Sequence, residues 1–294
     1  MNPMRTAPDL HLCLMTLDPG ACGGDPEGFT QHLIAEVQSA WQEGADVVLL
    51  PELLWMGLEP LLPEDQRHPR GVALHMAQVA LPRLLEAFSA DGKCVVLGST
   101  PWLLKDGGLR NRSHWICGGR LGHQDKLHLT PWEQDFSAGD QLQLFHWRGW
   151  TLLTLICLDI EVPELAAALR GRGVDLLLCP SATETELGAE RINRCASARS
   201  VELGCYVAVS ALTGSARSDL IDCNLGRSAL YRPSQQAFAS QQREQRSELQ
   251  TSGSQRQWVR LAGHELAQAR ANRTETNPSH LQPNLNITCI ACIT

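Results

Sequence analysis

Short apolar runs alternate with amphipathic helical patterns along the first two-thirds of the chain. A helical pattern begins at Asp25, Pro26 and Glu27, keeps its apolar residues on one face and ends near Gly44. Fully apolar runs are typical of strands buried on both faces, and strands that alternate with helices indicate a sheet covered by helices. The sequence therefore predicts an α/β fold. The expected strands are 11–17, 45–50, 93–97, 151–157, 174–179 and 205–210, and further helices are expected at about 74–88, after 163 and at 190–203.

The character of the chain changes after Pro233. Residues 234–257 are rich in Gln, Ser and Arg and show little periodicity, which indicates an exposed or flexible segment. A last helix is expected at 258–270 and a short apolar strand at 285–293. We expect one domain over 1–294, with an atypical polar C-terminal segment at 234–294.

Charge and hydropathy limit the class of partner. The formal net charge is −7, and no run of Lys and Arg forms the basic surface that nucleic acid requires. The longest apolar runs are too short to span a bilayer, and the first residues lack the apolar core of a secretory signal. We therefore expect a cytoplasmic protein that binds neither nucleic acid nor membrane.

Eleven cysteines are present. In a reducing compartment we expect them to be free thiols, mostly small buried side chains, with one reactive member. Cys289 and Cys292 form a C-x-x-C pair, but no second ligand pair with matching spacing accompanies it. Because a structural zinc site needs four ligands, no metal site is predicted.

Three polar residues occupy positions suited to a reaction. Glu52 directly follows one buried run, Cys157 ends another, and Lys126 lies in a polar stretch between them. In open α/β sheets, ligands bind beyond the carboxyl ends of the strands. A carboxylate can take a thiol proton while an ammonium stabilises an oxyanion, so the set suits acyl transfer. Taken singly, each residue is more often a solvated loop residue or part of the core than a catalytic group.

Short motifs around these residues favour the catalytic interpretation. They occur in one order along the chain, so they are more specific together than any one of them alone. With them the sequence resembles the nitrilase superfamily of carbon–nitrogen hydrolases. The motifs are P-E at Pro51-Glu52, K-x-H-L-x-P-x-E from Lys126 to Glu133, C-x-D from Cys157 to Asp159, F-x-x-G-D from Phe136 to Asp140 and P-S at Pro180-Ser181.

The resemblance implies a four-layer α-β-β-α sandwich and a reaction that uses no metal or organic cofactor. It implies that Glu52 is a general base, that Lys126 stabilises the oxyanion and that Cys157 is the nucleophile. Glu133 matches an assisting glutamate, and the backbone N–H of Leu158 is expected to help hold the oxyanion. Family members pair through helices, so a homodimer or higher homo-oligomer is expected.

The expected reaction is hydrolysis of a small-molecule amide through a cysteine thioester. Amide is favoured over nitrile because Leu158-Asp159 follows the nucleophile where nitrilases of the family carry Trp-Glu. Nitrile hydrolysis at the same site, or a catalytically silent binding module, are the alternatives. The substrate stays open among ω-amides of dicarboxylates, deaminated glutathione, N-carbamoyl compounds and aliphatic amides. Arg191 and Arg194 are candidates for pairing with a substrate carboxylate.

Overall fold

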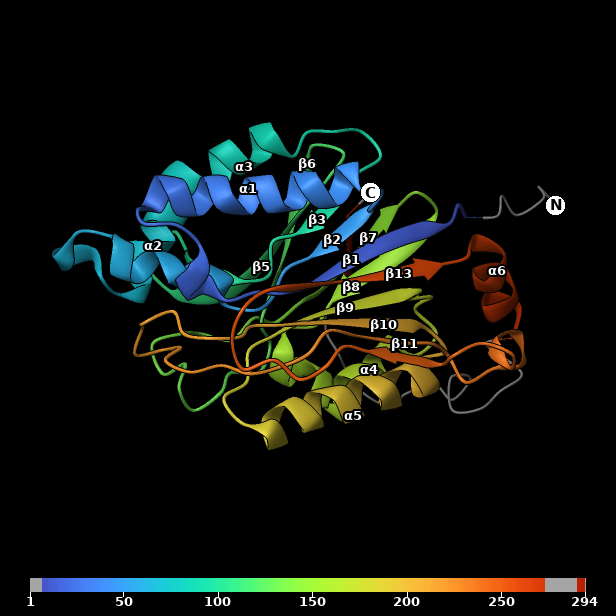
Figure 1. The fold of residues 1–294 in the computed structure, drawn as a ribbon. Helices are drawn as coiled ribbons and strands as arrows, with labels where there is room; N and C mark the ends of the chain where they lie inside the picture. Colours follow the sequence, from blue (N-terminus) through green and yellow to red (C-terminus); the bar gives the residue numbers. More distant parts are fainter. Residues whose placement is uncertain (1–6, 273–289, 294) are drawn as a thin grey trace.

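Two seven-stranded sheets face each other in a computed structural model that describes residues 7–272 and 290–293 (Figure 1). Helices cover the outer face of each sheet, so the expected α-β-β-α sandwich is confirmed. The first sheet has the order β13 (Gln255–Leu261), β1 (Leu10–Thr16), β2 (Val47–Leu49), β3 (Cys94–Val96), β5 (Leu109–Cys117) and β4 (Thr100–Leu103), with β6 (Arg120–Asp125) paired to β5. The second has the order β12 (Glu244–Arg246), β11 (Ala229–Tyr231), β10 (Tyr206–Ala211), β9 (Leu176–Ser181), β8 (Trp150–Thr154), β7 (Leu142–Trp147) and β14 (Ile290–Ile293).

The helices form the two outer layers. Helices α1 (Pro26–Gln42), α2 (Pro69–His75) and α3 (Leu81–Ala87) lie over the first sheet, and α4 (Pro163–Leu169) and α5 (Glu186–Leu203) lie over the second (Figure 1). Helix α6 (Gly263–Asn272) packs at one end of the sandwich. A π-helical stretch, η4 (Met76–Ala80), joins α2 to α3, and 3-10 turns occur at η1 (Pro19–Ala21), η2 (Leu54–Leu61), η3 (Glu64–Gln66), η5 (Cys157–Glu161) and η6 (Gln236–Phe238).

Alternate residues of each central strand enter different cores. On β1, Leu12 and Leu14 pack between the two sheets, whereas Cys13 faces the α1 side. On β9, Leu178 lies between the sheets and Leu177 packs toward α5. Because successive strand side chains point to opposite faces, a strand buried on both sides must be apolar at every position. The continuous apolar runs of the sequence arise in this way.

The start of α1 follows the local signals in the sequence. The Asp25 side chain accepts a hydrogen bond from the Gly28 N–H at 2.6 Å, and Pro26 occupies the first helical position. An N-terminal N–H without a partner in the helix is thereby satisfied, and proline loses nothing there because its missing N–H is not needed. The predicted helix start is confirmed.

The region between β3 and β8 differs from the expectation. Four antiparallel strands, β4 to β7, occupy residues for which no strand was predicted. Strand β5 carries the buried polar residues Asn111, Ser113 and His114 among its apolar ones, so it lacks the continuous apolar run that marks the parallel strands.

The C-terminal expectation is corrected in part. Trp258 lies in β13, not in a helix, and the last described helix begins only at Gly263. Strand β13 pairs antiparallel with β1, with Leu261 opposite Leu10. Its backbone groups are therefore hydrogen-bonded to a neighbouring strand and not within a helix. The polar segment after Pro233 includes the short strand β12. Of the predicted strand at 285–293, residues 290–293 form β14 beside β7, while 285–289, with Cys289 of the C-x-x-C pair, lie outside the described residues.

One pair of cysteines departs from the expectation of free thiols. Cys94 on β3 and Cys117 on β5 are register partners with Cα atoms 4.0 Å apart, and they form a disulfide. Cys157 remains a free thiol. Within the described residues, no helix combines the length and the apolar character that crossing a bilayer requires.

Candidate active site

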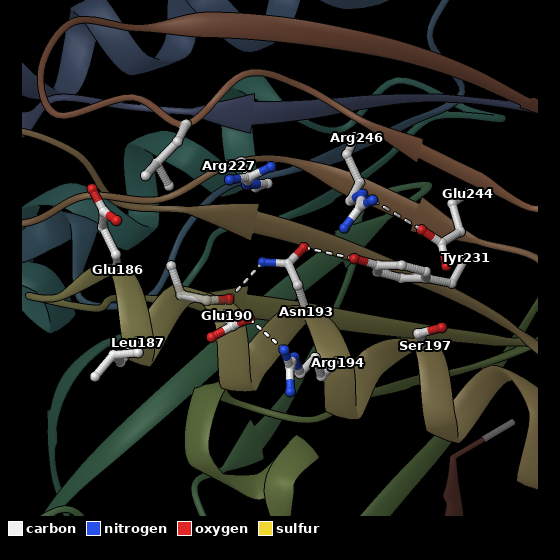
Figure 2. A pocket seen from close by; sticks show the side chains of 12 residues that line it. Glu186, Leu187, Glu190, Asn193, Arg194, Ser197, Arg227, Tyr231, Glu244 and Arg246 are labelled. Atoms are coloured by element: carbon white, nitrogen blue, oxygen red, sulfur yellow. Dashed lines mark hydrogen bonds and ion pairs between the residues drawn. The ribbon is translucent and has the colours of Figure 1, made fainter.

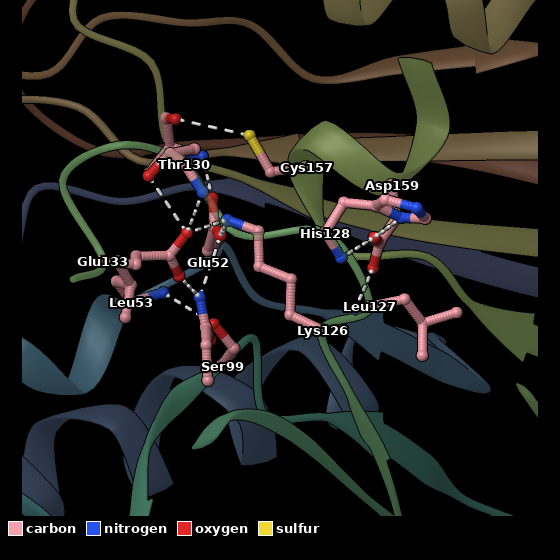
Figure 3. A network of polar contacts seen from close by, with 12 residues as sticks. Glu52, Leu53, Ser99, Lys126, Leu127, His128, Thr130, Glu133, Cys157 and Asp159 are labelled. Carbon is pink, nitrogen blue, oxygen red and sulfur yellow. Dashed lines mark hydrogen bonds and ion pairs between the residues drawn. The ribbon is translucent and has the colours of Figure 1, made fainter. Parts of the chain in front are cut away.

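Glu52, Lys126 and Cys157 meet at one end of the sandwich although they are far apart in sequence. Glu52 follows β2, Lys126 follows β6 and Cys157 opens the η5 turn after β8. All three line one cavity of about 280 Å³, and each is at most 5% exposed (Figure 3). The site that the sequence predicted is therefore assembled from both sheets.

Lys126 bridges two carboxylates. Its Nζ donates to Glu52 Oε1 at 2.7 Å and to Glu133 Oε2 at 2.7 Å, and all three side chains are about 2% exposed. Glu133 also accepts hydrogen bonds from the backbone N–H and the hydroxyl of Thr130, at 2.9 and 3.0 Å. Burying charge is unfavourable unless every ion is paired and hydrogen-bonded, and this network meets that condition.

Two members of the network were missed by the sequence analysis. Asn111 Nδ2 donates to Glu52 Oε1 at 3.0 Å and to Glu133 Oε1 at 2.7 Å. The backbone N–H of Ala182 donates to Glu52 Oε2 at 3.0 Å. Asn111 stands in none of the family-like motifs, and its contacts follow only from its inward position on β5. Ala182 comes directly after the Pro180-Ser181 motif, which was a signal for it.

Cys157 sits on a sharp turn. Its φ is +46°, in the left-handed region that residues other than glycine rarely adopt. This turn points the thiol into the cavity, where Sγ donates to the Ala182 carbonyl at 3.4 Å (Figure 3). Leu158 follows in the first turn of η5 and lines the same cavity. Strained backbone of this kind is often found at functional sites.

Asp159 holds the loop that carries Lys126. Its carboxylate accepts from the backbone N–H groups of Leu127 and His128, at 3.1 and 2.8 Å, and lies 3.1 Å from His128 Nδ1 (Figure 3). The hydrogen bond to Asp159 raises the pKa of His128. The C-x-D motif therefore links the turn that carries Cys157 to the loop that carries Lys126.

The pKa values of Glu52 and of Cys157 are both raised, chiefly by burial. Burial raises the pKa of Glu52 above its usual value, although the Lys126 charge and a hydrogen bond from Cys157 oppose the shift. Burial also raises the pKa of the Cys157 thiol, and the nearby Glu52 carboxylate adds to the rise while Lys126 opposes it. At neutral pH the resting sulfur is therefore a protonated thiol that needs a base before it can attack.

The two assisting groups stay charged. Burial alone would lower the pKa of Lys126, but the carboxylates of Glu52 and Glu133 outweigh it and raise that pKa. Burial would raise the pKa of Glu133, but the Lys126 charge and the hydrogen bonds from Lys126, Thr130 and Asn111 lower it instead. Such a site offers one thiol, one carboxylate able to accept a proton and one fixed cation. Among the described residues, no group of three His, Cys, Asp or Glu side chains is placed to hold a metal ion.

A larger cavity, of about 580 Å³, lies beside α5 and the β11–β12 strands, and it shares no lining residue with the first (Figure 2). Two ion pairs lie in its wall, Arg194 with Glu190 and Arg246 with Glu244. The free thiol of Cys157, the Glu52 carboxylate and the Lys126 ammonium all line the smaller cavity.

Comparison with known proteins agrees with this architecture. A sequence profile of the carbon-nitrogen hydrolase family matches residues 19–257, and the chain belongs to this family. It is 31% identical over 149 residues to the probable hydrolase YhcX of Bacillus subtilis, which covers 49% of this chain and 29% of that protein. It is 36% identical over 112 residues to an (R)-stereoselective amidase of Pseudomonas sp., covering 35% of this chain and 40% of the amidase. The chain thus spans less than half the length of these two relatives.

A solved structure shows the same fold. The amidase from Nesterenkonia sp. superposes with a TM-score of 0.66 at 22% identity, over 93% of this chain and 98% of that chain. The two-sheet arrangement seen here is therefore the fold of the carbon-nitrogen hydrolases.

Proposed function

We propose that this protein hydrolyses the amide bond of a small molecule through a thioester on Cys157. The observation that carries the proposal is the enclosure of a thiol, a proton-accepting carboxylate and a buried cation in one cavity. In a mutant of the Nesterenkonia amidase, acrylamide has added to the active-site cysteine. This reactivity of a cysteine in a protein of the same fold supports the assignment of Cys157 as the nucleophile.

The first half of the proposed reaction forms the thioester. Sγ of Cys157 attacks the amide carbonyl carbon while its proton passes to Glu52. The oxyanion that forms is held by Lys126 Nζ and by the backbone N–H of Leu158. When the C–N bond breaks, Glu52 returns the proton to the departing nitrogen, which leaves as ammonia or an amine. Each oxyanion donor contributes about 10²–10³-fold in rate.

The second half releases the acid. Glu52, again ionised, takes a proton from a water molecule that attacks the thioester carbonyl. Collapse of this second oxyanion expels the Cys157 thiolate, which recovers its proton from Glu52. General acid–base assistance of this kind contributes roughly 10²–10⁴-fold. Glu133 accepts hydrogen bonds from Lys126 and Asn111, and Asn111 also donates to Glu52, so we assign Glu133 and Asn111 to positioning.

The test compares two cysteine variants on a panel of simple amides, with ammonia release as the measurement. Cys157→Ala should lose at least about 10³-fold in kcat, because no other group can form the acyl intermediate. Cys195→Ala, on α5 and outside the cavity, is the matched control and should keep wild-type activity. In the wild-type protein, mass spectrometry of a quenched reaction should find the acyl group on Cys157.

Full activity in Cys157→Ala would overturn the proposal. Hydrolysis of nitriles but not of amides by the wild-type protein would move the assignment to the nitrilase alternative. Absence of turnover on every amide and nitrile, with Cys157 intact and the protein folded, would leave the binding-module alternative.

A further inference from the structure

The two oxygens of the Glu52 carboxylate have different surroundings. Oε1 accepts hydrogen bonds from Lys126 Nζ at 2.7 Å and from Asn111 Nδ2 at 3.0 Å (Figure 3). Among the described residues, the one nitrogen that donates to Oε2 is the backbone N–H of Ala182, at 3.0 Å. An ionised carboxylate has about four lone-pair sites, two on each oxygen. Oε1 is therefore filled by its two donors, and Oε2 keeps one position for a further proton.

The Cys157 thiol lies beside this second oxygen. Its Sγ donates to the Ala182 carbonyl at 3.4 Å, and a hydrogen bond also relates the thiol to the Glu52 carboxylate. A thiol has a single proton, so it can serve one of these two acceptors at a time. Ala182 thus contacts the base through its N–H and the nucleophile through its carbonyl.

The residues on both sides of Ala182 are anchored to neighbouring chain segments. The Ser181 hydroxyl donates to the Ser210 carbonyl at 2.8 Å. The Thr183 hydroxyl donates to the Leu225 carbonyl at 2.7 Å, and the Leu225 N–H donates to the Thr183 carbonyl at 2.8 Å. Because hydrogen bonds fix the residues before and after it, the Ala182 backbone is held in place at the cavity wall.

We infer that Oε2 is the oxygen of Glu52 that takes the Cys157 proton, and that Ala182 is the positioning residue that holds this oxygen and the thiol together. The inference rests on the proposed function and deepens it by naming the proton-accepting atom. In the first step the S–H bond breaks, an O–H bond forms on Oε2, and the sulfur electron pair forms the new S–C bond. Oε1 keeps its bonds to Lys126 and Asn111, so the protonated carboxyl stays in place to return the proton.

Replacing the Ala182 N–H by an ester oxygen tests this inference. Lactic acid incorporated in place of Ala182 makes this change and leaves the methyl side chain as it is. The probe is iodoacetamide, and mass spectrometry follows the alkylation of Cys157 as a function of pH. In the wild-type protein the rate should rise with pH as Glu52 ionises, because the thiol needs the carboxylate to take its proton. Glu52→Gln should abolish this rise.

The ester at position 182 should move the rise to higher pH. An N–H that donates to a carboxylate favours the ionised form, so its loss raises the pKa of Glu52 further. The shift should be roughly one pH unit or more, because hydrogen bonds to charged groups are among the strong ones. At a fixed pH below the midpoint of the rise, alkylation of Cys157 should be about tenfold slower than in the wild-type protein.

Lactic acid in place of Ala45 is the matched control. The Ala45 N–H donates to the Ala40 carbonyl at 2.9 Å, and neither residue lines the reaction cavity. This ester removes one backbone hydrogen bond and weakens the preceding carbonyl as an acceptor, as the ester at position 182 does. It should leave the alkylation profile of Cys157 unchanged.

A second pair of variants keeps every backbone group and tests the anchoring of Ala182. Ser181→Ala removes the hydroxyl that bonds the Ser210 carbonyl, and it should slow alkylation of Cys157 about two- to tenfold below the midpoint. Ser200→Ala is the control, because the Ser200 hydroxyl is also buried, donates to the Ser197 carbonyl at 2.7 Å and lies outside the cavity lining. It should leave the alkylation rate unchanged.

The inference and the proposed function fail in different ways. A rise that depends on Glu52 but stays at the same pH with lactic acid at position 182 would overturn the inference alone. If that variant does not fold, equal alkylation rates in Ser181→Ala and Ser200→Ala would overturn it. A rise that survives in Glu52→Gln would overturn the proposed function as well, because Glu52 would then not be the base.

Discussion

The two buried glutamates have opposite electrostatic roles. Burial raises the pKa of Glu52, whereas the Lys126 charge and its hydrogen bonds lower the pKa of Glu133, which stays ionised. Two carboxylates whose environments push their pKa values apart divide the work between a proton-transfer group and a fixed charge. Lys126 lies between them and remains an ammonium because both contribute negative charge.

This division predicts a pH profile. Glu52 must be ionised to accept the thiol proton, so kcat/KM should rise with pH through the Glu52 pKa, which lies above the usual carboxyl range. The Glu133 charge helps to raise that pKa, and Glu133→Gln should therefore move the acidic limb of the profile to lower pH while also reducing kcat. Glu164→Gln, an exposed change on α4, should leave the limb in place. A limb that moves to higher pH in Glu133→Gln would contradict the assignment.

At the scale of elements, two adjoining turns fix the position of Glu52. Leu53 has a φ of +51° and donates its backbone N–H to Ser99 Oγ at 3.0 Å. Gly98 precedes Ser99 in the turn after β3. It has a φ of +67° and lies against the Pro51 carbonyl, where a side chain would have no room. The end of β2 can therefore hold its glutamate only because the neighbouring turn contains glycine.

Gly98→Ala should damage both stability and activity. The left-handed backbone alone costs alanine roughly 1–2 kcal/mol, and the contact with Pro51 adds about 1–3 kcal/mol of overpacking. Gly92→Ala is the matched control, because Gly92 has a φ of +71° and open space around it, so only the backbone cost applies. Urea unfolding should separate the two variants, and kcat/KM should fall in Gly98→Ala alone as the Pro51-Glu52 turn moves. Equal losses of stability in the two variants would show that the Pro51 contact does not matter.

The sequence revealed some of these elements and concealed others for physical reasons. The parallel strands β1, β2, β3, β8, β9 and β10 are buried on both faces, so their apolar runs made them visible. Strand β5 places the polar side chain of Asn111 in the site. Because buried polar residues stand among its apolar ones, its sequence lacks the continuous apolar run that would have indicated a strand. Strand β13 is amphipathic enough to resemble a helix, and only its ladder with β1 decides its conformation.

The candidate site was predictable to the extent that local motifs encode it. Glu52, Lys126 and Cys157 each stand in a short motif, and the structure brings all three into one cavity. Asn111 and the Ala182 N–H reach Glu52 across 59 and 130 residues of sequence. The contact of Asn111 depends on the strand order within the first sheet and that of Ala182 on how the two sheets face each other, so no local pattern records either of them.

At the scale of the whole molecule, the site exists only because the two sheets pack together. The first sheet supplies Glu52, Asn111 and Lys126, and the second supplies Cys157 and the Ala182 backbone. The backbones of the two sheets meet directly where Leu17 and Leu212 form a β-bridge near the site. The core between the sheets therefore stabilises the fold that brings the two halves of the site together, while the polar residues line the cavity.

Substitution of two tryptophans can distinguish the contribution of the inter-sheet core from that of the cavity wall. Trp150 on β8 is fully buried between the sheets and donates its ring N–H to the Pro8 carbonyl at 2.9 Å, whereas Trp132 is 69% exposed and lines the reaction cavity. Trp150→Ala should lower the free energy of unfolding by about 3–5 kcal/mol, because it leaves a large hole in the inter-sheet core. Trp132→Ala, the same chemical change, should alter that free energy by only about 0.5 kcal/mol or less.

Activity should show the reverse order. At a temperature where both variants are folded, Trp150→Ala should keep most of its kcat/KM per folded molecule, since no atom of Trp150 lines the cavity. Trp132→Ala should lower kcat/KM by raising KM, because it removes an apolar wall from the substrate cavity. Denaturant unfolding monitored by circular dichroism, together with ammonia release, measures both effects. A large stability loss in Trp132→Ala would contradict the assignment of Trp132 to the cavity wall alone, and wild-type kinetics of this variant on every amide would mean that this cavity does not hold the substrate.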